Sequence, residues 1–267
     1  MKKYKIVVSD YDGTLVNDNK EITPKTLKAV NDFVKRGGIF IVCTGRMTTG
    51  IDHYLKDYGL ECLLASYNGG ELINLVNGEV LYSYPIDTDT CYNVFKLFEE
   101  LGVKGHSYDK GTFVSERGDK RIEFYQKMQG TEPIIVDKIS DYVKREKVSC
   151  VKILAFDDKD ILDKHYDTIK KSFRDLEVVR SNDLQIDINL KGVTKGNAIK
   201  LIADRLKVKV EDILAVGDAG NDVSMLKVAG FSVAMGNASE EIKNMCDAVT
   251  IDNNSDGIAY LIEKYCI

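Results

Sequence analysis

Short apolar runs that end on small or polar residues occur toward both ends of the chain and alternate with helical patterns. They cover residues 5–10, 38–45 and 62–70 in the first part of the chain, and 212–218, 231–235 and 248–252 in the last part. Strands that are apolar along their whole length are typical of a parallel sheet covered by helices on both faces. The sequence therefore predicts an α/β domain with a doubly wound parallel sheet, whose functional residues lie at the carboxyl ends of the strands.

The segment between the first two runs carries the signals of a single helix. Thr23 is a suitable N-cap, Pro24 occupies the first helical position, and Gly37 suits the left-handed conformation that often ends a helix. Apolar residues recur at helical spacing between them. Because this helix leads directly into the next run, we expect strand–helix–strand units, the connection that parallel strands require.

The middle of the chain has a different pattern. From residue 79 to 187 its strand-like segments alternate apolar and polar residues, which is typical of a sheet with one solvated face. We therefore expect an α+β domain over residues 84–189, inserted into a core formed by residues 1–83 and 190–267.

Charge and composition exclude several classes of function. With 37 basic and 42 acidic side chains, the chain has a formal net charge of −5, which does not favour binding to nucleic acid or to an anionic membrane surface. No apolar run approaches the length of a membrane span, and acidic residues follow the first run too early for a signal peptide. We expect a cytoplasmic protein, a monomer by default, with no nucleic acid and no membrane as partner.

The cysteines and histidines do not form a metal-binding pattern. The six cysteines contain no CxxC pair, and the three histidines contain no HxH or HExxH motif, so a zinc site is not expected. Buried, unreactive thiols are the simplest interpretation, with a catalytic cysteine paired with a histidine as the alternative.

Two carboxylates follow the first predicted strand with one residue between them. These are Asp10 and Asp12, in the segment DYDGTL. One such carboxylate can attack phosphorus to give an acyl phosphate, and the other can protonate the leaving oxygen and then deprotonate water. An Asx turn at a strand end is the structural alternative. A calcium loop is disfavoured, because Leu15 occupies the position where that loop needs glycine.

Groups suited to phosphate follow the second predicted strand and open the helix after the insertion. Thr44 and Gly45 offer a hydroxyl and backbone N–H groups at a strand-to-helix turn, and Arg46 could pair with an anionic substrate or with an acidic neighbour. Lys195 in GVTKG could neutralise phosphate charge and keep a nearby carboxylate ionised. Each residue taken alone also has an ordinary explanation, as part of a turn or as a solvated charge.

A second pair of carboxylates lies near the C-terminus. Asp218 ends the apolar run 212–218, and Asp222 follows at the start of a helix. Carboxylate oxygens suit Mg²⁺, which is usually held by a few carboxylates, waters and a substrate phosphate; capping of the helix is the alternative. Because all of these motifs fall at strand ends or helix starts, together they favour one site for phosphoryl transfer.

The motifs resemble those of the haloacid dehalogenase (HAD) superfamily and, within it, the Cof-type phosphatase branch. The resemblance covers essentially the whole chain and is carried by DYDGTL at 10–15, TGR at 44–46, SYNGG at 66–70, GVTKG at 192–196 and GDAGNDVSM at 217–225. It implies a Rossmann-like core with a large inserted cap domain that sets substrate specificity. It also implies an Mg²⁺-dependent phosphomonoesterase that acts on small phosphorylated metabolites, such as sugar phosphates, through an aspartyl-phosphate intermediate.

The resemblance also implies a role for each matching residue. Asp10 would be the nucleophile and Asp12 the general acid/base, with Mg²⁺ held by Asp10, Asp218 and the backbone carbonyl of Asp12. Asp222 would support Lys195 or a metal-bound water. The phosphoryl group would be bound by the Tyr11 backbone N–H, Thr44, Gly45, Lys195 and Asn221. Arg46 and Asn68 are candidates for contacts with the rest of the substrate.

The motifs leave other functions open. A phosphomutase of the same superfamily would use the same motifs, and a non-catalytic metabolite-binding protein could keep the fold. A receiver-like signalling module also phosphorylates an aspartate, but it is much shorter and needs no second acid/base. Sugar phosphates, pyridoxal phosphate and flavin mononucleotide are candidate substrates. Cap residues that could reach the site are His106, Tyr108, Lys110, Arg117 and Arg121.

Overall fold

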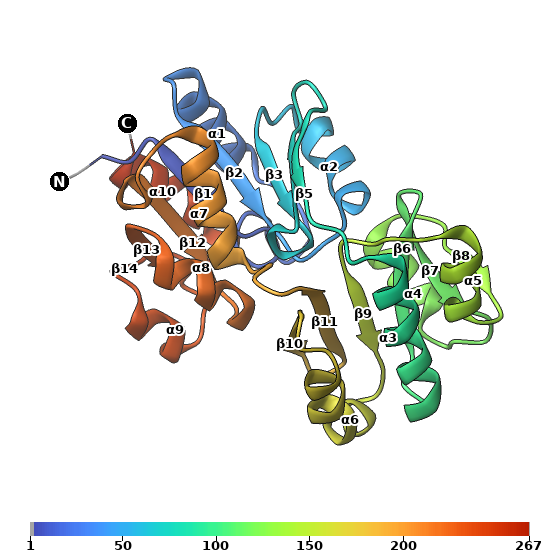
Figure 1. Cartoon of the computed structure of the whole chain (residues 1–267). Helices are drawn as coiled ribbons and strands as arrows, with labels where there is room; N and C mark the ends of the chain where they lie inside the picture. The colour runs from blue at the N-terminus through green and yellow to red at the C-terminus, as the bar shows by residue number, and fades with distance from the viewer. Residues whose placement is uncertain (1–2, 267) are drawn as a thin grey trace. The chain divides into compact units, whose positions relative to one another are not determined.

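The chain forms two compact units in a computed structural model that describes residues 3–266 (Figure 1). The core unit comprises residues 3–45, Asp52–Tyr82 and 194–266, and the inserted unit comprises Ser83–Val193 together with Arg46–Ile51. The sequence pattern predicts the changes of domain at 83/84 and 189/190 and places residues 46–51 in the core. That short segment groups with the inserted unit because it contacts it: Thr49 Oγ1 donates to the Gly111 carbonyl at 2.5 Å.

The core unit contains one eight-stranded sheet. Its strands are β1 (Ile6–Ser9), β2 (Ile39–Cys43), β3 (Leu63–Ser66), β4 (Glu71–Asn74), β5 (Val80–Ser83), β12 (Ile213–Gly217), β13 (Phe231–Ala234) and β14 (Ala248–Val249). They lie in the order β14-β13-β12-β1-β2-β3-β4-β5. Pairing is parallel from β14 to β3, and β4 adds antiparallel to β3. The predicted α/β fold with a parallel sheet is therefore confirmed.

Helices cover the two faces of this sheet. They are α1 (Pro24–Lys35), α2 (Asp52–Asp57), α7 (Lys195–Leu206), α8 (Val223–Val228), α9 (Glu240–Met245) and α10 (Gly257–Tyr265). On one face, Ile6 and Val8 of β1 pack in a cluster with Ile199 of α7. Val7, which points to the opposite face, is fully buried as well. Helices α1 and α10 pack against each other, as do α7 and α8.

The first helix begins and ends as predicted. The Thr23 hydroxyl accepts a hydrogen bond from the Thr26 N–H at 3.1 Å, and Pro24 is the first helical residue. Gly37 has a φ of 88°, a conformation that glycine adopts without a steric cost.

The inserted unit contains a six-stranded sheet with helices. Its elements are α3 (Thr88–Leu101), β6 (Gly105–Asp109), β7 (Thr112–Glu116), α4 (Ile122–Gln129), β8 (Ile134–Val136), α5 (Ile139–Glu146), β9 (Ile153–Phe156), α6 (Lys159–Ser172), β10 (Leu176–Asn182) and β11 (Gln185–Leu190). The strand order is β10-β11-β9-β6-β7-β8, and most pairs are antiparallel. Across residues 3–266, no helix is both long enough and apolar enough to cross a membrane.

His106 on β6 should make the stability of the inserted unit depend on pH. Its side chain is fully buried against the Tyr125 ring, 4.5 Å between centroids, and neither ring nitrogen has a hydrogen-bond partner among residues 3–266. Burial lowers the pKa of His106 to about 3. The unfolded chain binds a proton near pH 6.5 and the folded chain does not, so this stabilisation is complete above about pH 6.5 and is lost progressively as the pH falls toward 3.

We expect His106 to account for a loss of about 2 kcal/mol of unfolding free energy between pH 7 and pH 5. The variant His106→Phe keeps an aromatic ring but binds no proton, so its unfolding free energy should fall less over that range. Urea unfolding of the two proteins at both pH values measures this difference. Equal falls in the variant and the wild type would contradict the expectation.

Candidate active site

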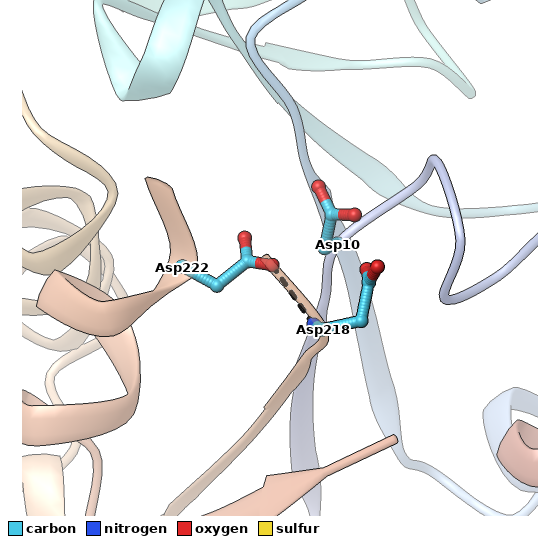
Figure 2. Close-up of side chains that lie close together, drawn as sticks. All are labelled: Asp10, Asp218 and Asp222. Atoms are coloured by element: carbon cyan, nitrogen blue, oxygen red, sulfur yellow. Dashed lines mark hydrogen bonds between the residues drawn. The ribbon is translucent and has the colours of Figure 1, made fainter. Parts of the chain in front are cut away.

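Four charged side chains meet at the carboxyl ends of the central strands of the core unit. Asp10 directly follows β1 and Asp218 directly follows β12, and these two strands are parallel neighbours. Lys195 is the first residue of α7, and Asp222 immediately precedes α8. Figure 2 shows the three carboxylates lying close together, and one oxygen from each lies within 4.8 Å of the other two.

Lys195 bridges two of these carboxylates. Its ammonium Nζ donates to Asp10 Oδ1 at 2.5 Å and to Asp222 Oδ1 at 2.6 Å, and the residue is 1% exposed. Burial opposes the charge, but the carboxylates of Asp10 and Asp222 outweigh it and raise the pKa of Lys195. The lysine is therefore a fixed, buried cation, and its ordinary alternative, a solvated charge, is wrong for this residue.

Asp222 holds the turn on which Asp218 lies. Its Oδ2 accepts from the backbone N–H groups of Asp218 and Ala219, each at 3.0 Å, while its Oδ1 accepts from Lys195. Asp222 is fully buried. Because both of its oxygens are already hydrogen-bonded within the protein, Asp222 is suited to positioning its neighbours more than to binding a ligand directly.

Asp218 is restrained by the turn that follows Asp10. The Thr14 hydroxyl donates to Asp218 Oδ1 at 2.8 Å. Burial raises the pKa of Asp218 to about 6, although the Thr14 hydrogen bond acts in the opposite direction. Gly13 has a φ of 77°, and a Cβ at that position would lie 2.6 Å from Asp218 Oδ2. The sequence pattern predicts no role for Gly13 or Thr14, although both follow a strand end, where functional residues are expected.

Gly13→Ala should therefore damage the site. The added methyl group must displace the Asp218 carboxylate, and a displacement of about 1 Å in a catalytic group can lower activity by about 10²-fold. Gly37→Ala is the matched control, because Gly37 has a similar φ of 88° and, within the described chain, nothing within 4 Å of the added Cβ. Both variants should lose stability, but only Gly13→Ala should lose the activity that the sequence predicts, measured as kcat/KM for a phosphate ester. Equal kcat/KM values in the two variants would contradict the role given to Gly13.

The net negative charge of the cluster would favour binding of a divalent cation. With Asp10, Asp218 and Asp222 ionised and Lys195 protonated, these four residues carry a net charge of −3 + 1 = −2. Burial, together with repulsion from Asp222, raises the pKa of Asp10 well above its usual range, and Lys195 only partly opposes this. Carboxylate oxygens in this arrangement fit Mg²⁺, whose charge would favour their ionised forms.

The second predicted strand end also lies in the core unit. Thr44 follows β2 and is buried, its N–H donates to the Ala65 carbonyl at 2.9 Å, and its own carbonyl accepts from the Asn68 N–H at 2.8 Å. Asn68 is also buried and has a left-handed φ of 61°. Gly45 follows Thr44 as the last residue of this part of the core unit. Because β1 and β2 are parallel neighbours, Thr44 and Asp10 follow adjacent strands.

The other predicted residues have surroundings of their own. The Asp12 carboxylate accepts from Lys20 Nζ at 2.9 Å in a pair that is partly exposed. Tyr11 is buried, and Asn221 lies in the short turn Gly220–Asp222. Arg46 belongs to the inserted unit, where its Nη1 donates to the Met128 carbonyl at 3.1 Å.

Two of the cap residues that were expected to be able to reach a substrate, and one of the six cysteines, have other environments. His106 packs among aromatic rings of the inserted unit, which corrects the expectation that it could reach a substrate. Arg121 is mostly buried in an ion pair with Asp157, which corrects the same expectation. Burial raises the pKa of the Cys43 thiol to about 12, so a catalytic thiolate at that position is disfavoured.

Comparisons with known proteins agree with this architecture. The model of the haloacid dehalogenase-like hydrolase family matches residues 7–262. A Streptococcus pyogenes protein is 29% identical over 98% of both chains. The Bacillus subtilis protein named 5-amino-6-(5-phospho-D-ribitylamino)uracil phosphatase YcsE is 26% identical over 98% of this chain and 96% of its own. The crystal structure of a haloacid dehalogenase-like hydrolase from Bacteroides thetaiotaomicron superposes with a TM-score of 0.87 at 27% identity, over 98% of this chain and 99% of that one.

Proposed function

The chain belongs to the haloacid dehalogenase-like hydrolase family, and we propose that it is an Mg²⁺-dependent phosphomonoesterase that acts through an aspartyl-phosphate at Asp10. The observation that carries the proposal is the buried bridge from Lys195 to Asp10 and Asp222, because it places a carboxylate nucleophile beside a permanent cation. The phosphatase name of a relative that aligns over nearly its whole length supports the same reaction class.

Mg²⁺ would be held by Asp10, Asp218 and the backbone carbonyl of Asp12. When bound, the ion supplies charge neutralisation to the phosphoryl group and helps to align it for attack. Asp222 takes the supporting role, since its oxygens are engaged by Lys195 and by backbone N–H groups.

Asp10 attacks phosphorus through the oxygen that Lys195 does not hold. Lys195 stabilises the ionised form of Asp10 and the negative charge on the phosphoryl oxygens. Thr44, Asn221 and the backbone N–H groups of Tyr11 and Gly45 donate to those oxygens.

Two bond exchanges complete the proposed reaction. In the first, the bond from phosphorus to the ester oxygen breaks as the bond to Asp10 forms, and Asp12 gives its proton to the leaving alcohol. In the second, Asp12 takes a proton from water, which attacks the aspartyl-phosphate and releases inorganic phosphate with the Asp10 carboxylate restored. Lys20 Nζ donates to Asp12 Oδ1 at 2.9 Å, so a cation lies beside the group that transfers the proton.

The substrate class is a small phosphorylated metabolite such as a sugar phosphate. The inserted unit acts as the cap that sets specificity, and Arg46 and Asn68 contribute contacts to the organic part of the substrate. We place the protein in the cytoplasm as a monomer, with neither nucleic acid nor membrane as a partner.

Phosphate release from a panel of phosphorylated metabolites tests this function. The panel contains sugar phosphates, pyridoxal phosphate and flavin mononucleotide, and each compound is assayed with Mg²⁺ and with EDTA. We expect release from at least one compound with Mg²⁺ and its loss in EDTA, with recovery when Mg²⁺ is restored. Release that EDTA does not change would contradict the metal requirement. No release from any compound would count against the phosphatase.

A further inference from the structure

Asn237 connects three of the loops at the carboxyl edge of the core sheet. It lies in the loop after β13, and its side-chain Nδ2 donates to the Gly13 carbonyl at 2.9 Å and to Asp218 Oδ2 at 3.4 Å. Its Oδ1 accepts from the Asn253 N–H at 3.1 Å. A single amide side chain therefore joins the loops that follow β1, β12 and β14.

These contacts restrain Asp218 from two sides. Thr14 donates to Asp218 Oδ1, and Asn237 donates to Asp218 Oδ2. Asn237 also donates to the carbonyl of Gly13, the residue between Asp12 and Thr14. The turn that carries the Thr14 donor is therefore itself held by Asn237. The orientation of the Asp218 carboxylate is thereby fixed relative to the backbone that follows Asp10.

We propose that Asn237 is a positioning residue for the metal site, which orients Asp218 and the Asp12–Thr14 turn and so raises the affinity of the site for Mg²⁺. This inference rests on the proposed function, because it takes Asp10, Asp218 and the Asp12 carbonyl as the groups that hold the ion. Hydrogen bonds to metal ligands commonly change metal affinity by about tenfold or more. Asn237 is solvent-exposed, so its replacement leaves the apolar core intact.

The test measures Mg²⁺ binding to the substrate-free protein by titration calorimetry. In Asn237→Ala we expect the Kd for Mg²⁺ to rise by about tenfold. Asn254→Ala is the matched control: Asn254 is also exposed and joins the loops after β1 and β14, but through Asp18 and not through Gly13 or Asp218. The control should keep the wild-type Kd. Asn237→Ser, a second variant that suits a surface turn, should match Asn237→Ala.

A kinetic measurement separates positioning from a general structural role. At saturating Mg²⁺, Asn237→Ala should keep kcat and the substrate KM within about twofold of wild type, because the bound ion itself restores the geometry. A fall in kcat that excess Mg²⁺ does not correct, or an unchanged Kd for Mg²⁺ in both Asn237 variants, would overturn the inference while leaving the proposed function intact. Absence of Mg²⁺ binding in the wild-type protein would overturn the proposed metal site and this inference together.

Discussion

Asp10→Asn is expected to lower kcat by about 10⁴-fold or more and to leave the protein folded. An amide of nearly the same size cannot attack phosphorus, and loss of a nucleophile removes an entire covalent route. The change also removes a buried negative charge, while Lys195 keeps its partner Asp222 at 2.6 Å. We therefore expect the free energy of unfolding to stay within about 1 kcal/mol of wild type or to rise.

Phosphate release and urea unfolding of the same preparation measure both parts of this prediction. Asp32→Asn is the matched control, because Asp32 is a carboxylate on the surface of α1 that pairs with Lys28, away from the strand ends. It should keep wild-type activity. Turnover in Asp10→Asn at more than a trace of the wild-type rate would show that another group is the nucleophile.

Lys195→Met is expected to lower the free energy of unfolding by about 3–5 kcal/mol and also to lower the activity. The substitution leaves the carboxylates of Asp10 and Asp222 buried without their cation, and breaking a buried ion pair by removing one partner carries a cost of this size. Lys20→Met is the control, since the pair of Lys20 with Asp12 is partly exposed and exposed pairs contribute about 0–1 kcal/mol. Chemical unfolding in EDTA measures both changes without a contribution from bound metal.

A second substitution separates the electrostatic cause from a loss of packing. Adding Asp222→Asn to Lys195→Met removes one of the two unpaired charges, so part of the lost stability should return. Activity should not return, because the lysine that stabilises the phosphoryl charge is still absent. If the double variant were no more stable than Lys195→Met, the loss of unfolding free energy would come from lost packing and not from unpaired charge.

The positions of the site residues could be predicted because the fold imposes them. Asp10, Thr44 and Asp218 each follow an apolar run, and parallel strands bring the ends of such runs to one edge of the sheet. Membership of the HAD family, which the motifs indicated, is confirmed by the family model over residues 7–262. Local sequence was therefore sufficient for the fold class and for the candidate residues.

The network among those residues could not be predicted, because it depends on contacts between distant segments. The motifs indicated a carboxylate near Lys195 and a supporting role for Asp222, but no local signal indicates the buried contact with Asp10, 185 residues away. Asn237 lies after an apolar run, as the other site residues do, but a lone amide in a loop has no distinctive pattern. Strand β6 also shows no alternation of apolar and polar residues that would predict a strand, because its His106 and Ser107 are polar and yet fully buried.

The central claim, covalent catalysis by Asp10, is tested most directly by trapping the phosphorylated enzyme. The Asp12→Asn variant should accumulate it, because the group that activates water is missing, and acetyl phosphate should form it, because its leaving group needs little protonation. After an acid quench and proteolysis, mass spectrometry should find one phosphoryl group on the peptide that contains Asp10, and none in Asp10→Asn/Asp12→Asn. A phosphoryl group on another residue, or no phosphorylated peptide while phosphate is still released, would contradict the account.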